Sequence, residues 1–303
     1  MKVDALHCIQ KNKSVLGEGP LWDAREEALY WIDVLKPEIH RHHPATGINS
    51  RWTMSSSVGA IALAERGHLL VALEREGICE LELESGALRP FCNPLALPGA
   101  PVVPGRFNDG AVDAQGNFWV GWLTHSREQP GRLFRISPSG EVTTILTDPV
   151  APNGLGWSPD GKTFYFTDSH INTIWAYDCD LVSGTLSNRR VLARQERQFG
   201  IFDGLSVDAE GNIWTALYGG GAVVQLSPRG EEMERIHLPV CLVTSCAFGG
   251  PYLKQLMITS AVRNQSAAEL AGQPLAGSVF SHPVLVAGRP EAIFGDTNET
   301  KRA

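Results

Sequence analysis

Six short apolar or aromatic runs recur along the 303 residues at intervals of roughly 40–50 residues, the repeat length of a β-propeller blade. Gly, Pro, Asp, Asn or Ser bound each run, as in an all-β chain, and no long amphipathic helical stretch separates them. An α/β barrel would need a long helix after each strand, so the repeat favours a six-bladed propeller. The runs are residues 29–32, 69–72, 118–121, 164–167, 213–216 and 256–259.

The turns between the runs indicate four strands in each repeat. Segments 113–117, 158–162 and 208–212 precede three of the runs and place Gly in a tight hairpin, where a positive φ is needed. A further strand–turn–strand unit follows, as in segment 133–140. We therefore predict one propeller domain over residues 1–303, with four antiparallel strands per blade. Residues 5–9 are left over and are predicted to close the last blade as its outermost strand.

One position recurs in all six repeats. Stepping back from each run by the same number of residues gives Glu18, Val58, Asn108, Asn153, Asp203 and Ser245. The next residue is usually Gly or another small residue, as a crowded inner strand requires. Since the innermost strand of each blade lines the axial channel, Glu18, Asn108, Asn153 and Asp203 should converge near one face of the propeller.

The converging side chains form an oxygen-rich, anionic set. Glu18, Asn153 and Asp203 offer hard ligands to one divalent ion, Ca²⁺, Mg²⁺, Mn²⁺, Fe²⁺ or Zn²⁺. Three protein ligands leave coordination positions open for water and substrate, which is typical of a catalytic metal. Each segment taken alone reads as an ordinary turn or loop; the shared register favours a site instead.

The composition excludes other classes of function. A formal net charge of −7 provides no basic field for nucleic acid. No apolar run approaches the length needed to span a bilayer, and the N-terminus carries no secretion-type segment. The six cysteines are scattered and form no Cys-x-x-Cys pair, so we expect reduced thiols in a cytoplasmic, soluble protein. The oligomeric state is predicted only as monomer or small homo-oligomer.

Several segments resemble the SMP-30/gluconolactonase/regucalcin family over nearly the whole chain, from about residue 16 to about residue 287. They are 16–22 (LGEGPLW), 106–110 (RFNDG), 152–155 (PNGL), 187–190 (SNRR), 202–205 (FDGL) and 246–250 (CAFGG). The resemblance implies a six-bladed propeller with one divalent metal and lactonase activity on aldonolactones. It also implies that Glu18, Asn153 and Asp203 are metal ligands, and that Asp203 transfers protons.

The resemblance further implies substrate-binding roles for Arg106 and Asn108. The chain departs from the family after the third-blade strand, where Trp122 to Ser126 replace a segment that carries an acidic pair. The acidic substrate contact is missing, so a different sugar preference is expected. Trp122 and His125 are candidate pocket residues there, although they also read as a packed indole and a surface histidine. Tyr218 is a further candidate for the pocket lining.

The function predicted from these residues is hydrolysis of a sugar lactone to its aldonic acid, by a carboxylic-ester hydrolase of carbohydrate catabolism. The metal would polarise the lactone carbonyl and activate water, and Asp203 would accept a proton. No Gly-x-Ser-x-Gly nucleophile elbow occurs. Two alternatives stay open: a non-catalytic, calcium-binding regulatory propeller, and a metal-dependent esterase or phosphoesterase.

Overall fold

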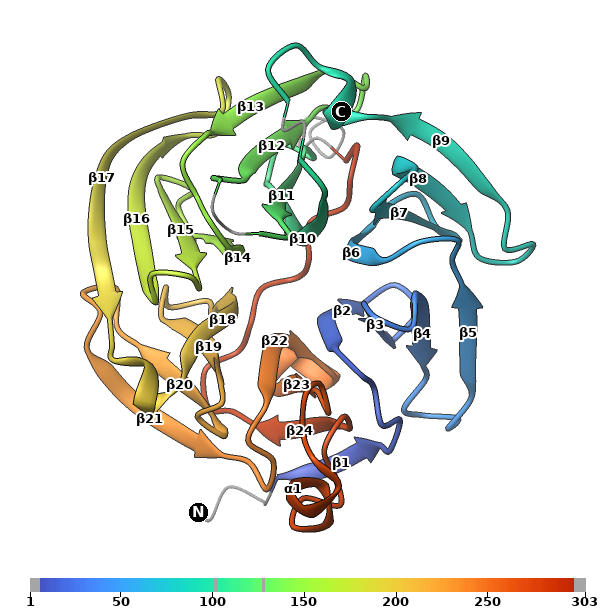
Figure 1. Cartoon of the computed structure of the whole chain (residues 1–303), viewed down its shortest axis with the longest axis vertical. Coiled ribbons are helices and arrows are strands. Elements are labelled where there is room, and N and C mark those ends of the chain that lie inside the picture. The colour runs from blue at the N-terminus through green and yellow to red at the C-terminus, as the bar shows by residue number, and fades with distance from the viewer. Residues whose placement is uncertain (1–5, 101–102, 127–128, 297–303) are drawn as a thin grey trace.

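The computed structural model describes residues 6–100, 103–126 and 129–296. These residues form six four-stranded antiparallel sheets, arranged as blades around a central channel (Figure 1). In blades 1 to 5 the chain passes from the innermost strand outward, and in blade 6 it does so over the three inner strands. The six-bladed, all-β propeller with four strands per blade is therefore confirmed.

The strands group into blades as follows. Blade 1 contains β2 (Gly17–Asp23), β3 (Ala28–Asp33), β4 (Glu38–His42) and β5 (Asn49–Thr53). Blade 2 contains β6 (Val58–Leu63), β7 (His68–Leu73), β8 (Gly77–Glu82) and β9 (Leu88–Cys92). Blade 3 contains β10 (Gly105–Val112), β11 (Phe118–Thr124), β12 (Arg132–Ile136) and β13 (Val142–Leu146).

The second half of the ring follows the same plan. Blade 4 contains β14 (Pro152–Trp157), β15 (Thr163–Asp168), β16 (Thr173–Asp180) and β17 (Thr185–Arg194). Blade 5 contains β18 (Ile201–Val207), β19 (Ile213–Tyr218), β20 (Ala222–Leu226) and β21 (Glu232–His237). Blade 6 contains β22 (Val243–Gly249), β23 (Gln255–Ser260), β24 (Val279–Pro283) and β1 (His7–Gln10).

Blade 6 joins the two ends of the chain. Strand β1 pairs antiparallel with β24, so an N-terminal strand closes the last blade, as predicted. Ala5 belonged to the predicted strand but lies outside the described residues. Within the described residues, four short helical segments connect the strands: η1 (Pro94–Ala96), η2 (Arg197–Phe199), η3 (Pro251–Leu253) and α1 (Ala267–Ala271). None of the helices in the described part of the chain has the length and apolar character to cross a membrane.

The six apolar runs form the second strand of each blade, where both faces of the sheet are covered. In β3, Tyr30 and Ile32 pack into one cluster of buried side chains, whereas Leu29 and Trp31 pack into another. Successive residues of a strand point to opposite faces, so a strand sandwiched between other blades favours apolar residues at consecutive positions. Such packing explains why the runs are continuous and do not alternate with polar residues.

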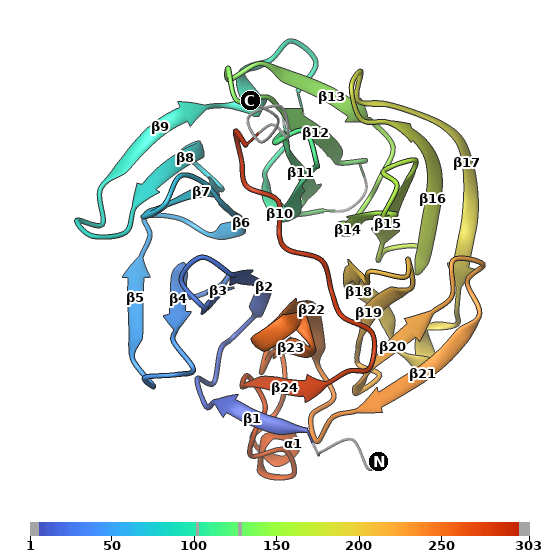
Figure 2. The same ribbon diagram turned by 180° about the vertical axis from the view of Figure 1, so that it is seen from behind.

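The segment that follows β24 crosses the middle of the ring on the face shown in Figure 2. It bonds to five of the six blades. Its contacts are Gly288 N to Leu253 O (2.8 Å), Ala209 N to Ala287 O (2.9 Å), Arg289 Nη1 to Trp157 O (3.1 Å), Gly295 N to Gly116 O (3.0 Å) and Phe294 N to Leu63 O (2.8 Å). This segment, residues 284–296, is called the strap below. It ties the blades together and covers the channel on that face.

Candidate functional site

The site position that recurs in every repeat coincides with an irregularity in every innermost strand. The pairing between the first and second strands shifts at Glu18, Val58, Asn153 and Ser245, and beside Asn108 and Asp203. A β-bulge inserts an extra residue and re-aims the side chains around it. At the bulges, the side chains of the site residues therefore no longer follow the regular up-and-down alternation of the strand.

Two buried aspartates hold the segments that lead into the site. Asp33 accepts hydrogen bonds from the backbone of Val15 (2.8 Å) and Leu16 (3.1 Å), directly before Gly17 and Glu18. Asp168 does the same in blade 4, accepting from Val150 (2.9 Å) and Ala151 (3.1 Å) just before Asn153. Backbone donors at a strand entrance would otherwise lack partners, and their capture fixes where each strand begins.

Glycine after the site residue permits neighbouring inner strands to approach closely, as predicted. A Cβ atom on Gly154 would lie 2.7 Å from the carbonyl oxygen of Asp203, and one on Gly204 would lie 2.1 Å from Ser245 Oγ. Any larger residue would push blades 4, 5 and 6 apart at the channel. These two glycines thus set the spacing of the side chains that face the channel.

Glu18, Asn108, Asn153 and Asp203 line one pocket of about 260 Å³ at the channel mouth. Asn153 Nδ2 donates to Asp203 Oδ1 in a short contact and to Ser169 Oγ at 3.1 Å. Asn153 and Asp203 are only 8% and 6% exposed. The structure thus brings together residues from blades 1, 3, 4 and 5 that lie far apart in the sequence.

The electrostatics of the pocket are those of crowded carboxylates. Burial raises the pKa of Glu18 well above its usual value, and the charges of Asp203 and Asp109 raise it further. The Arg106 guanidinium partly offsets these effects on the pKa. Negative charge on buried, closely spaced carboxylates is costly without a positive partner. A cation held between Glu18 and Asp203 would relieve the cost.

The donor set fits a hard divalent ion. No group of three or more His, Cys, Asp and Glu side chains that could hold an ion occurs within residues 6–100, 103–126 and 129–296. The candidate set has two carboxylates, from Glu18 and Asp203, and its third oxygen belongs to the amide of Asn153. Carboxylate and amide oxygens suit Ca²⁺, Mg²⁺ or Mn²⁺ better than soft ions.

Arg106 and Asn108 lie beside these carboxylates in the same pocket. Arg106 Nη1 donates to Phe107 O (3.0 Å) and makes a short contact with Asn108 Oδ1. Asn108 Nδ2 donates to Pro152 O at 2.7 Å, which joins blade 3 to the strand of Asn153. Both side chains are half-buried and held in place, as a preorganised polar cradle requires.

Two residues predicted to bind substrate are not brought into this pocket. Trp122 is 3% exposed and packs against Phe107, with ring centroids 5.0 Å apart. His125 is exposed and its backbone N–H donates to Pro104 O at 2.9 Å. Neither is among the residues that line the pocket. Their positions agree with the alternative interpretation from the sequence, in which Trp122 is a packed indole and His125 is a surface histidine.

Sequence reasoning missed four polar residues of the pocket: Ser169, Arg197, Arg263 and Asn264. They lie on connections between strands, where the repeat carries no register signal. A partial signal existed for Ser169, because it follows the strand-end aspartate Asp168. Tyr218, the further candidate from the sequence, does line the pocket.

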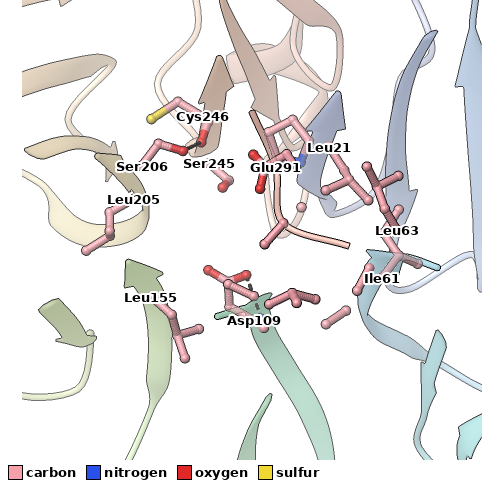
Figure 3. Close-up of a pocket in the computed structure, with 18 residues that line it drawn as sticks. Leu21, Ile61, Leu63, Asp109, Leu155, Leu205, Ser206, Ser245, Cys246 and Glu291 are labelled. Carbon is pink, nitrogen blue, oxygen red and sulfur yellow. Dashed lines mark hydrogen bonds between the residues drawn. The ribbon is translucent and has the colours of Figure 1, made fainter. Parts of the chain in front are cut away.

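A second cavity, of about 70 Å³, lies deeper in the channel, between the site and the strap. Asp109 from β10 and Glu291 from the strap project into it from opposite sides, near Ser206 and Ser245 (Figure 3). Burial raises the pKa of Asp109 to about 6 and that of Glu291 to about 7. For Glu291, Arg289 lowers the pKa and Asp109 raises it. The strap thus carries an acid that burial keeps about half protonated at pH 7.

We expect Glu291→Gln to raise the free energy of unfolding by about 1–3 kcal/mol at pH 8 and to change it little at pH 4.5. The folded-state pKa of Glu291, about 7, lies above its ordinary value of 4.5. The stability linked to its protonated form is therefore complete below pH 4.5 and is lost as the pH rises through 7. Glutamine stays neutral and avoids this loss.

Urea unfolding at both pH values measures the effect. Glu234→Gln, at an exposed position of β21, is the matched control and should shift neither curve. An unchanged or lower stability of the Glu291→Gln variant at pH 8 would contradict the burial of this carboxyl.

The chain is similar to proteins named as sugar lactonases and to regucalcins. The family model described as SMP-30/gluconolactonase/LRE-like region matches residues 16–262. A 6-deoxy-6-sulfogluconolactonase of Pseudomonas putida is 38% identical over 96% of this chain and 99% of its own length. A pentonolactonase of Haloferax volcanii is 34% identical over 91% and 93%.

The solved structures agree with this likeness. A regucalcin of Agrobacterium tumefaciens, described as a calcium-binding protein, superimposes with a TM-score of 0.89. It is 29% identical, and the match covers 96% of this chain and 97% of that protein. The sequence motifs, the six blades and the shared register of the site residues all agree with this family assignment. The chain is a member of the SMP-30/gluconolactonase/LRE-like family.

Proposed function

We propose that this protein is a metal-dependent lactonase that hydrolyses a sugar lactone of the aldonolactone class to its aldonic acid. One observation carries the proposal: the oxygen donors of Glu18, Asn153 and Asp203 share a pocket with the polar side chains of Arg106 and Asn108. The lactonase names of the relatives from Pseudomonas putida and Haloferax volcanii support it.

Glu18, Asn153 and Asp203 would hold the divalent ion. When bound, the ion would supply Lewis-acid polarisation of the lactone carbonyl and lower the pKa of a water molecule. Asn153 is already fixed by Ser169, which in turn donates to Phe202 O at 2.7 Å. This chain of hydrogen bonds ties the amide to the neighbouring blade, and the same Nδ2 donates to Asp203 Oδ1, so the amide would turn its oxygen toward an ion bound there.

In the proposed hydrolysis, Asp203 accepts a proton from water as the water oxygen bonds to the carbonyl carbon. The ring C–O bond then breaks, and the proton passes to the departing ring oxygen. The products are the open-chain acid and its free hydroxyl, so no other reactant is required. Arg106 would stabilise the negative charge that develops on the carbonyl oxygen, because a guanidinium is a fixed cation with several donors. Asn108 would hydrogen-bond a ring substituent or water.

A non-catalytic, regulatory role is the second candidate function, because one relative is described as a calcium-binding protein. Arg106 and Asn108 favour catalysis, because simple retention of a cation has no use for a positive, hydrogen-bonding side chain beside the ligands. A metal-dependent esterase or phosphoesterase would use the same oxygens, and the polar cradle does not discriminate against it. Substrate contacts by Trp122 and His125 stay a prediction that their positions do not support.

A pH-drop assay with D-glucono-1,5-lactone and pentonolactones, corrected for spontaneous hydrolysis, tests the proposal. Acid release should be accelerated in the presence of Ca²⁺, Mn²⁺, Mg²⁺ or Zn²⁺ and should fall to the background rate with excess EDTA. Parallel assays with a phenyl ester and a phosphotriester test the alternative of a metal-dependent esterase or phosphoesterase. The proposal of a metal-dependent lactonase would be rejected if hydrolysis were still accelerated after complete chelation of the metal. It would also be rejected if no lactone were hydrolysed faster than the background rate.

A further inference from the structure

The lining of the pocket is rich in guanidinium groups. Arg106, Arg197 and Arg263 all line it. Arg197 lies in η2, which connects blade 4 to blade 5, and Arg263 follows β23 in blade 6. Arg197 is exposed and Arg263 half-buried, whereas Asn153 and Asp203 are buried. The two connection arginines therefore lie nearer the rim of the pocket than the residues assigned to the metal.

These two arginines have no acidic partner among the residues that the structure describes. Arg197 Nη2 donates only to backbone carbonyls, to Ser169 O at 3.5 Å and to His170 O in a short contact. Arg263 makes no hydrogen bond or ion pair with any of the residues that the structure describes. The carbonyl contacts anchor Arg197 beside the pocket, and the unpartnered guanidinium of Arg263 remains available to a ligand. A guanidinium has five donors, so both groups retain bonding capacity.

The acidic side chains of the pocket are already assigned elsewhere. Among the residues that line it, only Glu18 and Asp203 are acidic, and both belong to the proposed metal site. Three guanidinium groups thus face two carboxylates in a protein whose formal net charge is −7. A neutral sugar presents hydroxyl groups, which need acceptors as well as donors. Guanidinium groups in excess of the carboxylates of a pocket are the complement of an oxyanion on the ligand.

We infer that the lactone carries an anionic substituent, a sulfonate or phosphate on the carbon remote from the carbonyl, and that Arg197 and Arg263 bind it. The inference rests on the proposed lactonase function and narrows its substrate class. With the carbonyl at Glu18, Asn153 and Asp203, the far end of a monosaccharide lactone points toward the rim. There the two guanidinium groups make charge-assisted hydrogen bonds to the tetrahedral oxyanion.

The test compares kcat/KM for D-glucono-1,5-lactone with kcat/KM for its 6-phospho and 6-deoxy-6-sulfo forms. In the wild-type protein at least one anionic lactone should be preferred by about tenfold or more. Arg263→Gln and Arg197→Gln should each lower the ratio of anionic to neutral kcat/KM by about tenfold, through KM. Arg197→Lys, which keeps the charge, should retain part of the preference. Arg229→Gln, at an exposed turn of blade 5, is the matched control and should leave the ratio unchanged.

Binding measurements separate this inference from the proposed function. Titration calorimetry with gluconate, 6-phosphogluconate and 6-deoxy-6-sulfogluconate, in EDTA, measures recognition of the anion without turnover. The anionic acids should bind more tightly than gluconate, and Arg263→Gln should remove that difference even if no lactone is hydrolysed. Equal binding and equal kcat/KM for neutral and anionic forms would overturn the inference. So would inorganic phosphate or sulfate binding as tightly as the substituted sugars, because the site would then hold a free anion.

Discussion

Replacing Asp203 by alanine is expected to reduce lactone turnover by at least about 10³-fold and to weaken metal binding in the same variant. Asp203 is buried beside Asn153, and it is both a proposed ion ligand and the proposed proton acceptor. Its removal leaves Glu18 as the only acidic side chain of the pocket. Steady-state assays at saturating metal, with metal titration by calorimetry, measure the two losses separately.

Asn108→Ala is the matched control within the same pocket. Asn108 contacts Arg106 and Pro152 and is not among the proposed ligands, so its loss should lower turnover while most of the metal affinity remains. Retained metal affinity in the Asp203→Ala variant would remove Asp203 from the ligand set. Turnover close to wild type in that variant would remove it from the mechanism.

The fold could be read from the sequence because its determinants are local and repeated. Each second strand is built around a continuous run of mostly apolar residues, and each glycine of the predicted hairpins adopts a positive φ, such as 76° at Gly116 and 89° at Gly211. Six copies of one pattern average out the ambiguity of any single strand. The closing strand β1 followed from counting, since the segment before Glu18 belonged to no repeat.

The site was predictable only where it obeys the repeat. Glu18, Asn108, Asn153 and Asp203 share one register position, so their convergence followed from the propeller itself. Arg197 and Arg263 lie on connections whose lengths differ between blades, and no periodic signal marks them. Glu291 lies in the strap, whose path across the channel depends on contacts with five blades. Long-range contacts of this kind leave no trace in local sequence patterns.

Asp208→Ala is expected to lower the free energy of unfolding by about 3–5 kcal/mol, a larger change in stability than that expected for Glu291→Gln. Asp208 is fully buried and accepts hydrogen bonds from the backbone of Glu210 (3.0 Å) and Asn212 (2.9 Å). It also accepts from Trp214 Nε1 at 3.1 Å and Gln225 Nε2 at 3.2 Å. Alanine would leave these buried donors without a partner and loosen the indole that packs between blades 5 and 6.

Asp113 builds the same network in blade 3, with Gln115, Asn117 and Trp119 as donors, so Asp113→Ala should be destabilised to a similar degree. Urea unfolding at pH 7, followed by tryptophan fluorescence, measures both variants. Asp160→Ala is the matched control, because Asp160 lies in the corresponding hairpin of blade 4 but is exposed, and its midpoint should stay close to wild type. If Asp208→Ala unfolds at the wild-type midpoint, the buried carboxylate is not what fixes Trp214, and apolar packing between blades must hold these hairpins by itself.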